Sequence, residues 1–365
     1  MFTVHHEPNF SRFRDTLLLR QAWRRPPQFD FHIADNHKVE VLGREPENAD
    51  DQVEFFRRAG YDYVHAPLFV PALELRAHQE AQRGAAGVQS HGGPGIIRDA
   101  THYRGQAWSW QRLSNGDVGD VQEALDNFEQ LAAALPDSMK LILHVMDVFT
   151  FAWEMIGFDE FCFASFDDPE WVHEVMDSLA AAVEILAEAA IARAGDRIGA
   201  VLYSDDIAYT EGLMLSPDFF REHLFPIVAR LVQRGQAIDA PLIYHSDGRL
   251  YDVLNDLISV GVKGIQPLEP KSMEPLEIKR RWPGQVCLLG HIDLDLMARG
   301  TPGEVEAYVR HDIERLNADG GYIVGVSNTV PDYVRTDNYL RMIETIHRYP
   351  DEPIPMPVPA KGASA

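Results

Sequence analysis

Short apolar runs alternate with amphipathic segments along most of the chain. Eight runs have the length of buried strands, and polar residues, glycine or proline bound most of them. They are residues 28–34, 61–68, 140–146, 198–204, 241–246, 262–268, 285–292 and 321–327. This pattern predicts eight strands spread over the whole sequence.

Segments with apolar positions at helical spacing lie between most of these runs. They include 168–195, 216–235 and 301–321. Ser216-Pro217 and Thr301-Pro302 are typical helix starts, with a capping hydroxyl before a proline. Alternating strands and helices predict a parallel sheet. Eight such units predict an α/β chain folded as a (β/α)8 TIM barrel.

The stretch from 69 to 139 departs from this alternation. It is too long for a simple crossover between the second and third strands, and part of it is rich in Gly, Gln and His. We expect an insertion that forms a lid over the barrel mouth. Residues 1–350 would then be a single barrel domain. We expect 351–365, which is proline-rich and then small and polar, to be a flexible tail.

Polar residues follow most of the predicted strands, as in "HVMD" (144–147) and "YHSDG" (244–248). In a parallel barrel the C-terminal ends of the strands meet at one rim, where active sites lie. Residues two apart share one face of a strand. We therefore expect a catalytic group at the centre of this rim and substrate contacts around it. The catalytic candidates are Asp206, His245, Asp247 and Asp293, and the substrate-binding candidates are Asp205, Glu269, His291 and Asn328.

Each of these residues also has a structural interpretation. An aspartate after a strand is often only a helix N-cap, which suits Asp293, Asp247 and one of Asp205 and Asp206. A histidine on a strand is often a hydrogen-bonded core residue. The functional interpretation depends on the whole set lying on one rim, because strand starts such as "DRIG" and "PGQV" carry no comparable set.

An imidazole and two carboxylates are suited to two kinds of chemistry. They can bind a divalent metal, with His245, Asp247 and Glu269 as candidate ligands and Asp206 or Asn328 as alternatives for the third. They can also act as acid and base, with their pKa values separated by crowding. The H-x-D spacing leaves both possibilities open, because it supplies at most two ligands.

Charge and cysteine content exclude some classes of partner. The net charge is −23, from 33 basic and 56 acidic residues, which disfavours nucleic acid and anionic membranes. No apolar run reaches the ~18 residues of a membrane span. The N-terminal residues do not resemble a secretion signal, and Cys162 and Cys287 form no disulfide framework, so we expect a cytoplasmic protein. A homodimer is also expected, with Trp108 and Trp110 as candidate contacts.

Four segments resemble the uroporphyrinogen decarboxylase superfamily in order and spacing. They are "YSDDIAYTEGLMLSPDFFREHLFPIVARLV" (203–232), "YHSDGRLYDVLNDLISVGVKGIQPLEP" (244–270), residues 288–331 and "DNYLRMIETIHRY" (337–349). The resemblance covers most of the chain from about residue 140. It implies a (β/α)8 barrel and either of two chemistries. Decarboxylases remove the acetate carboxyls of uroporphyrinogen without metal or cofactor. Methyltransferases use zinc to move methyl groups between a corrinoid protein and a thiol or related acceptor.

The methyltransferase branch is the closer match. Its H-x-C zinc ligands correspond to His245 and Asp247, and its last cysteine falls near Ser327-Asn328. The resemblance therefore implies a site that is richer in oxygen than a thiolate zinc site. The arginine motif of the decarboxylases resembles "RQAWR" (20–24), but we expect Arg20 and Arg24 on an exposed N-terminal helix.

Three functions remain in view. The first is methyl transfer or demethylation of a small methylated substrate, with zinc or another divalent metal and a corrinoid protein as partner. The second is uroporphyrinogen decarboxylation without a cofactor. The third is a non-catalytic barrel that docks a corrinoid protein.

Overall fold

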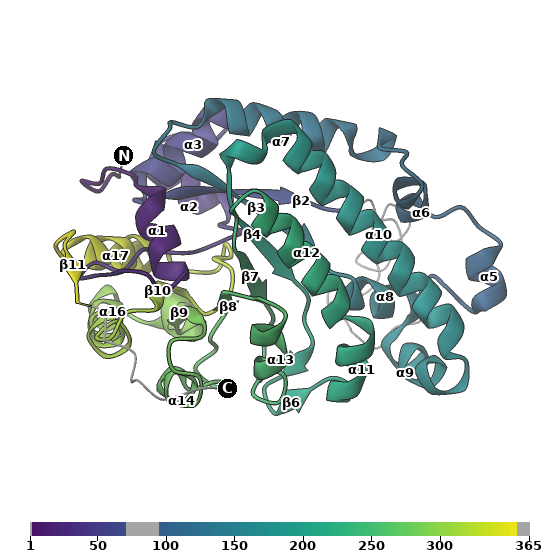
Figure 1. Cartoon of the computed structure of the whole chain (residues 1–365). Helices are drawn as coiled ribbons and strands as arrows, with labels where there is room; N and C mark the ends of the chain where they lie inside the picture. The colour runs from purple at the N-terminus through teal and green to yellow at the C-terminus, as the bar shows by residue number, and fades with distance from the viewer. Residues whose placement is uncertain (1, 71–94, 356–365) are drawn as a thin grey trace.

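A curled sheet of seven parallel strands forms the centre of the protein (Figure 1). The computed structural model describes residues 2–70 and 95–355. The strand order is β10-β9-β8-β7-β4-β3-β2. The strands are β2 (Tyr63–Leu68), β3 (Lys140–Met146), β4 (Ile198–Ser204), β7 (Leu242–His245), β8 (Gly264–Gln266), β9 (Cys287–Ile292) and β10 (Tyr322–Val326). Seven of the eight predicted strands are confirmed, and so is the TIM-barrel-like α/β fold.

The first predicted strand, 28–34, is an extended segment that does not form a regular strand. It makes only isolated parallel bridges, from Gln28 to Val324 of β10 and from Ile33 to Val330 beyond the end of β10. On its other side, Asp30 N donates to the Tyr63 hydroxyl of β2 at 2.9 Å. His32 has φ +48°, a left-handed conformation that interrupts a ladder of backbone hydrogen bonds. The segment therefore lies between the two edges of the sheet without completing an eighth strand.

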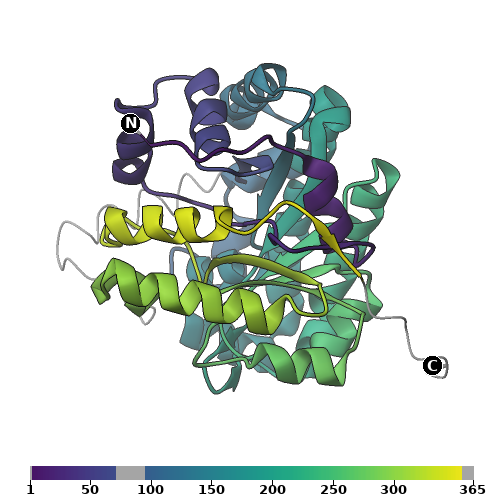
Figure 2. The ribbon, with the colours of Figure 1, turned by 90° about the vertical axis from the view of Figure 1, so that its left-hand side faces the viewer.

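Helices surround the sheet and connect its strands (Figures 1 and 2). The N-terminal half contains α1 (Phe10–Leu17), α2 (Asp35–Leu42), α3 (Ala49–Arg58), α5 (Ala100–Arg104), α6 (Ser109–Ser114), α7 (Gln122–Ala134), α8 (Phe149–Ile156), α9 (Phe158–Asp167) and α10 (Pro169–Ala194). The C-terminal half contains α11 (Pro217–His223), α12 (Phe225–Ala237), α13 (Leu254–Ser259), α14 (Pro275–Arg281), α15 (Leu294–Arg299), α16 (Pro302–Leu316) and α17 (Thr336–His347). Within the described residues, no helix is long and apolar enough to cross a membrane.

The predicted helix boundaries hold in two of three cases. The 168–195 segment is α10, and Thr301 caps α16 in a reciprocal capping box with Glu304. The 216–235 segment is two helices, because α11 ends at His223 and α12 begins at Phe225, just before Pro226. A proline so early in α12 removes a backbone donor that a continuous helix would need.

The C-terminal part of the predicted insertion is a helix that packs on the sheet. Helix α7 contacts β2, α3 and α10 as an ordinary crossover helix does. Residues 71–94 of the predicted lid lie outside the described part of the chain. Trp108 and Trp110 are buried and stacked, so the prediction that they offer an exposed dimer contact is wrong.

A short antiparallel ladder joins an N-terminal segment to a C-terminal segment. Strand β11 (Pro353–Ile354) pairs antiparallel with β1 (Ala22–Trp23). The beginning of the predicted tail is therefore ordered by pairing, while residues 356–365 lie outside the described part. Arg20 and Arg24 are exposed, as expected, but they follow α1 and are not part of it.

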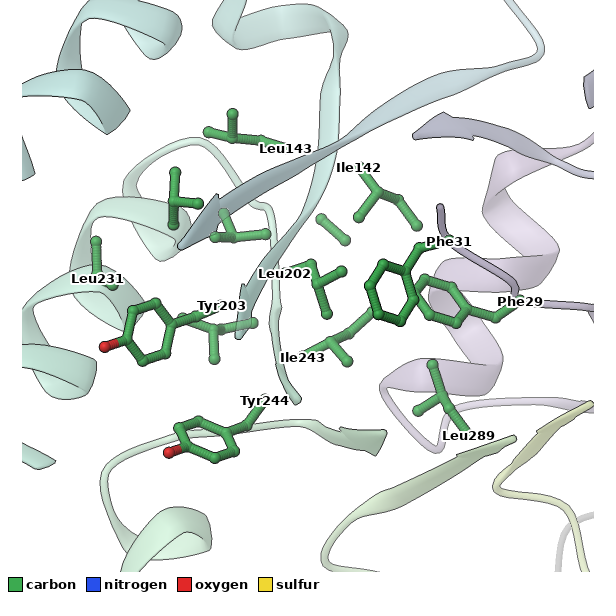
Figure 3. Packing of buried hydrophobic residues seen from close by; sticks show 14 of the residues in the cluster. Phe29, Phe31, Ile142, Leu143, Leu202, Tyr203, Leu231, Ile243, Tyr244 and Leu289 are labelled. Carbon is green, nitrogen blue, oxygen red and sulfur yellow. The ribbon is translucent and has the colours of Figure 1, made fainter. Parts of the chain in front are cut away.

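The barrel interior is filled by side chains that alternate along the strands. Figure 3 shows Phe29, Phe31, Ile142, Leu202 and Ile243 gathered at the centre. The tyrosines that follow two of these residues, at 203 and 244, point outward instead, toward the helices. All of these residues are buried, so the interior of the barrel is a packed core. The polar residues lie at the rim formed by the C-terminal strand ends.

Candidate active site

Asp206, His245 and Asp247 form one group at the C-terminal ends of β4 and β7. The two strands are neighbours, and Ser204 is in register with His245, which brings Asp206 beside the histidine. The His245 Nε2 atom lies 3.8 Å from Asp206 Oδ1 and 3.9 Å from Asp247 Oδ1. One ligand atom from each of the three residues lies within 4.8 Å of the other two. The structure therefore brings together three of the four predicted catalytic residues.

Neighbouring side chains fix the orientation of this group. His245 Nδ1 donates to Gln266 Oε1, at the end of β8. Asn328 Nδ2 donates to both carboxylate oxygens of Asp247, at 2.9 and 2.8 Å. The Asp247 backbone N donates to Asp206 Oδ1 at 2.8 Å. With Nδ1 as the donor, a neutral His245 carries a lone pair at Nε2, and this atom faces one carboxylate oxygen of Asp206 and one of Asp247.

Such an arrangement needs a positive species for stability. Burial raises the pKa of Asp247 to about 6; the charge of His245 lowers it, and the carboxylates of Asp206 and Glu269 raise it further. A proton on one of the three groups, or a bound cation, would remove the repulsion between acceptors. One imidazole nitrogen and two carboxylates are a ligand set that suits a divalent metal. Gln266 and Asn328 supply the outer hydrogen bonds that orient metal ligands in proteins.

A cavity of about 310 Å³ opens above this group. Its walls combine the two apolar rings of Phe31 and Phe69 with polar side chains from four neighbouring strand ends. The described residues that line it are Phe31, His32, His65, Phe69, His144, Met146, Asp147, Ser204, Asp205, Asp206, His245, Asp247, Asn328 and Thr329. No lysine or arginine is among them, so the described lining offers no fixed cation for an anionic substrate.

A second polar group lies on the β2–β4 side of the same cavity. His65 Nε2 and His144 Nδ1 are 2.9 Å apart, and His144 Nε2 lies 2.8 Å from Ser204 Oγ. Ser204 Oγ donates to Asp147 Oδ1 at 2.9 Å. The sequence signal was the strand end "HVMD", but no single residue of it was selected. His65 was missed because nothing in its local sequence marks it.

Asp205 has a structural role, and its carboxylate is occupied by hydrogen bonds within the protein. Its buried carboxylate accepts from the backbone N atoms of Val148, Phe149 and Thr150, at 2.8–3.0 Å. It also accepts from the hydroxyls of Thr150 and Tyr203, at 3.0 and 2.7 Å. These bonds tie the end of β4 to the start of α8 and occupy the carboxylate that was predicted to contact substrate.

Three other predicted residues lie outside the central group. Glu269 Oε2 accepts from Gly248 N at 2.8 Å and from Ser272 Oγ at 3.1 Å, and it lines none of the described cavity. Asp293 caps α15, as its structural interpretation suggested. His291 Nδ1 lies 2.6 Å from Asp312 Oδ2 in a buried pair. The third member of the metal-like group is therefore Asp206, which the sequence offered only as an alternative ligand.

Comparisons with known proteins agree with the architecture. A methyltransferase from Methanosarcina mazei aligns over 94% of this chain and 99% of its own, with a TM-score of 0.65 and 14% identity. At that identity the similarity shows the fold alone. A zinc-bound IOLI protein aligns over 86% of this chain and 97% of its own, at 9% identity, but its TM-score of 0.39 is too low to support an argument. A search among curated proteins found no significant match.

One family model identifies the family of this protein. The model described as uroporphyrinogen decarboxylase (URO-D) matches residues 85–349, which include every strand end of the candidate site from β3 onward. The match covers more than half of the sequence, and it agrees with the resemblance seen in the strand-end motifs. The chain belongs to the uroporphyrinogen decarboxylase (URO-D) family.

Proposed function

We propose that the protein is a methyltransferase or demethylase that acts on a small methylated substrate, with a divalent metal at Asp206, His245 and Asp247 and a corrinoid protein as partner. The observation that carries the proposal is the convergence of one ligand atom each from Asp206, His245 and Asp247, all within 4.8 Å of one another, at the cavity floor. A bound divalent metal would supply Lewis-acid polarisation there.

The residues around the metal-like group have separate roles in this proposal. Gln266 and Asn328 hold His245 and Asp247 in a ligating orientation. Phe31 and Phe69 exclude water from the small cavity and give a methyl group an apolar surface. The size of the cavity suits a substrate of a few heavy atoms to one small ring.

The charge of the cavity disfavours the decarboxylase alternative. Uroporphyrinogen carries eight carboxylates, whereas the described cavity lining holds four aspartates and no lysine or arginine. Charges of the same sign at close range cost several kcal/mol, so such a substrate would be repelled. Arg20 and Arg24, the residues that resemble the decarboxylase motif, are exposed and do not line this cavity.

The corrinoid partner is the part of the proposal that depends on family likeness. His245 occupies the ligand position of the methyltransferase branch, and the Methanosarcina structure that shares the fold is a methyltransferase. A docking protein without catalysis would not need three converging acceptor groups. Alanine at His245 would leave such docking intact and would abolish methyl transfer.

The first test is metal content. The purified protein, offered zinc, cobalt or manganese, should retain about one metal per chain by elemental analysis, and His245→Ala should lose it. Asp293→Ala is the matched control, because this aspartate lies on the same rim but caps α15. The second test is methylation of added cob(I)alamin from methoxy, thiomethyl and methylamine donors. No metal in the wild type and no transfer from any donor would refute the proposal.

A further inference from the structure

The cavity has a hydrogen-bonded chain of side chains that the metal-like group does not use. It runs from Asp147 through Ser204 and His144 to His65, with successive atoms 2.9, 2.8 and 2.9 Å apart. The residues come from three neighbouring strand ends, β2, β3 and β4. Strand register places them on a diagonal, since His65 pairs with Ile142 and His144 with Leu202. Regular sheet geometry therefore places these side chains within hydrogen-bonding distance of one another.

The hydrogen-bonded side chains differ in their exposure to solvent. Asp147, Ser204 and His144 are buried, whereas His65 at the far end is half-buried and lies beside the exposed His32. All four members line the cavity. His65 is thus the most solvent-accessible member, and Asp147 at the other end is buried.

Burial and hydrogen bonding also restrict the protonation state and the tautomer of the two histidine rings. Burial lowers the pKa of His65 to about 3 and holds that of His144 well below its usual range, so both rings are neutral. A neutral ring has one N–H. If His65 donates from Nε2, His144 must accept at Nδ1 and carry its own proton on Nε2. If His65 accepts at Nε2, His144 must carry its proton on Nδ1. The two rings must therefore have the same tautomer.

Both tautomeric states keep every hydrogen bond, and they differ by one proton at Asp147. In the first state Ser204 donates to an ionised Asp147. In the second state a protonated Asp147 donates to Ser204, and the direction of every bond is reversed. A proton that enters at His65 Nδ1 moves the His65 Nε2 proton to His144 Nδ1. The His144 Nε2 proton then moves to Ser204, and the Ser204 proton moves to Asp147.

We propose that Asp147, Ser204, His144 and His65 form a proton relay that supplies the cavity with the proton needed when the methyl group leaves its substrate. This inference rests on the proposed function. The bond between the methyl carbon and its heteroatom breaks, with the electron pair left on the heteroatom. The methyl group goes to the reduced corrinoid of the partner, and the proton of Asp147 goes to the heteroatom. The relay then returns one proton to Asp147.

Histidine tautomers test the relay without any need for activity. Nitrogen-15 NMR of the imidazole rings should show His65 and His144 neutral and in the same tautomer. Asp147→Ala should change the tautomer balance of His65, three residues further along the relay, and should have no such effect when Ser204 is already alanine. Opposite tautomers in the wild type, or an Asp147→Ala effect that persists without the Ser204 hydroxyl, would overturn the relay.

Kinetics test its use in the reaction. Ser204→Ala should lower kcat by about 100-fold, the lower range for loss of general acid catalysis, with KM and metal content nearly unchanged. Asp147→Ala should be partly rescued by added formate, which a purely structural role would not allow. Ser165→Ala, on α9 and bonded to Phe161 O, is the control for loss of a hydroxyl. An unchanged kcat in Ser204→Ala would refute the relay, while a wild type that transfers no methyl group would refute the proposed function instead.

Discussion

Two adjacent aspartates at the end of β4 should respond to alanine in opposite ways. Asp205 is fully buried and accepts five hydrogen bonds that join β4 to the start of α8. The Asp206 side chain is 44% exposed and accepts from Asp247 N. Asp205→Ala should therefore remove stability, and Asp206→Ala should remove metal binding.

The size of the first effect follows from the orphaned donors. A buried donor without an acceptor costs about 1–3 kcal/mol, and Asp205→Ala leaves three backbone amides and two hydroxyls. Water in the vacated space and relief of the buried charge offset part of this cost, so we expect a loss of about 4 kcal/mol in the free energy of unfolding. With an unfolding entropy of about 2.1 cal/mol/K per residue, that corresponds to a Tm about 5 °C lower.

Calorimetry and metal titration on the two variants check the contrast. Asp206→Ala should unfold within about 1 kcal/mol of the wild type, because it loses one hydrogen bond and relieves repulsion with Asp247. It should bind metal much more weakly. If Asp205→Ala were as stable as the wild type, or if Asp206→Ala kept full metal affinity, the assignment of structural and ligating roles would be refuted.

Five further outcomes are expected. Gln266→Leu removes the acceptor of His245 Nδ1 and should weaken metal binding about 10- to 100-fold with the fold retained, measured by competition with a chelating dye. Because the pKa of Asp247 is raised to about 6, protonation of Asp247 should weaken metal binding progressively as the pH falls below that value. Without metal, Asp247 takes up its proton more readily folded than unfolded, so its contribution to stability should fall as pH rises from about 4 to 6. Asn328→Ala removes donors that lower this pKa and should move the affinity midpoint to higher pH. Trp110→Ala should cost about 4 kcal/mol in unfolding experiments, because the ring is fully buried.

The sequence determined the alternation of strands and helices and the rim on which the polar residues lie. Hydrophobic periodicity is a local property, and the positions of seven strands and of two of the three predicted helices follow from it. His245 and Asp247 could be placed together because they lie two residues apart at one strand end. Capping at Thr301 was equally visible, since its partner Glu304 is three residues away.

Tertiary structure decided which of the rim residues share a site. Asp205 and Asp206 are neighbours in sequence, and only packing against α8 turns one into a structural anchor and leaves the other beside His245. Glu269 turns toward Gly248, a contact across two strand ends that no local pattern encodes. His65 and His144, 79 residues apart, meet only because β2 and β3 pair in one register. Hydrophobic patterning thus sets the elements, whereas the direction of each polar side chain depends on the long-range pairing that fills its hydrogen bonds.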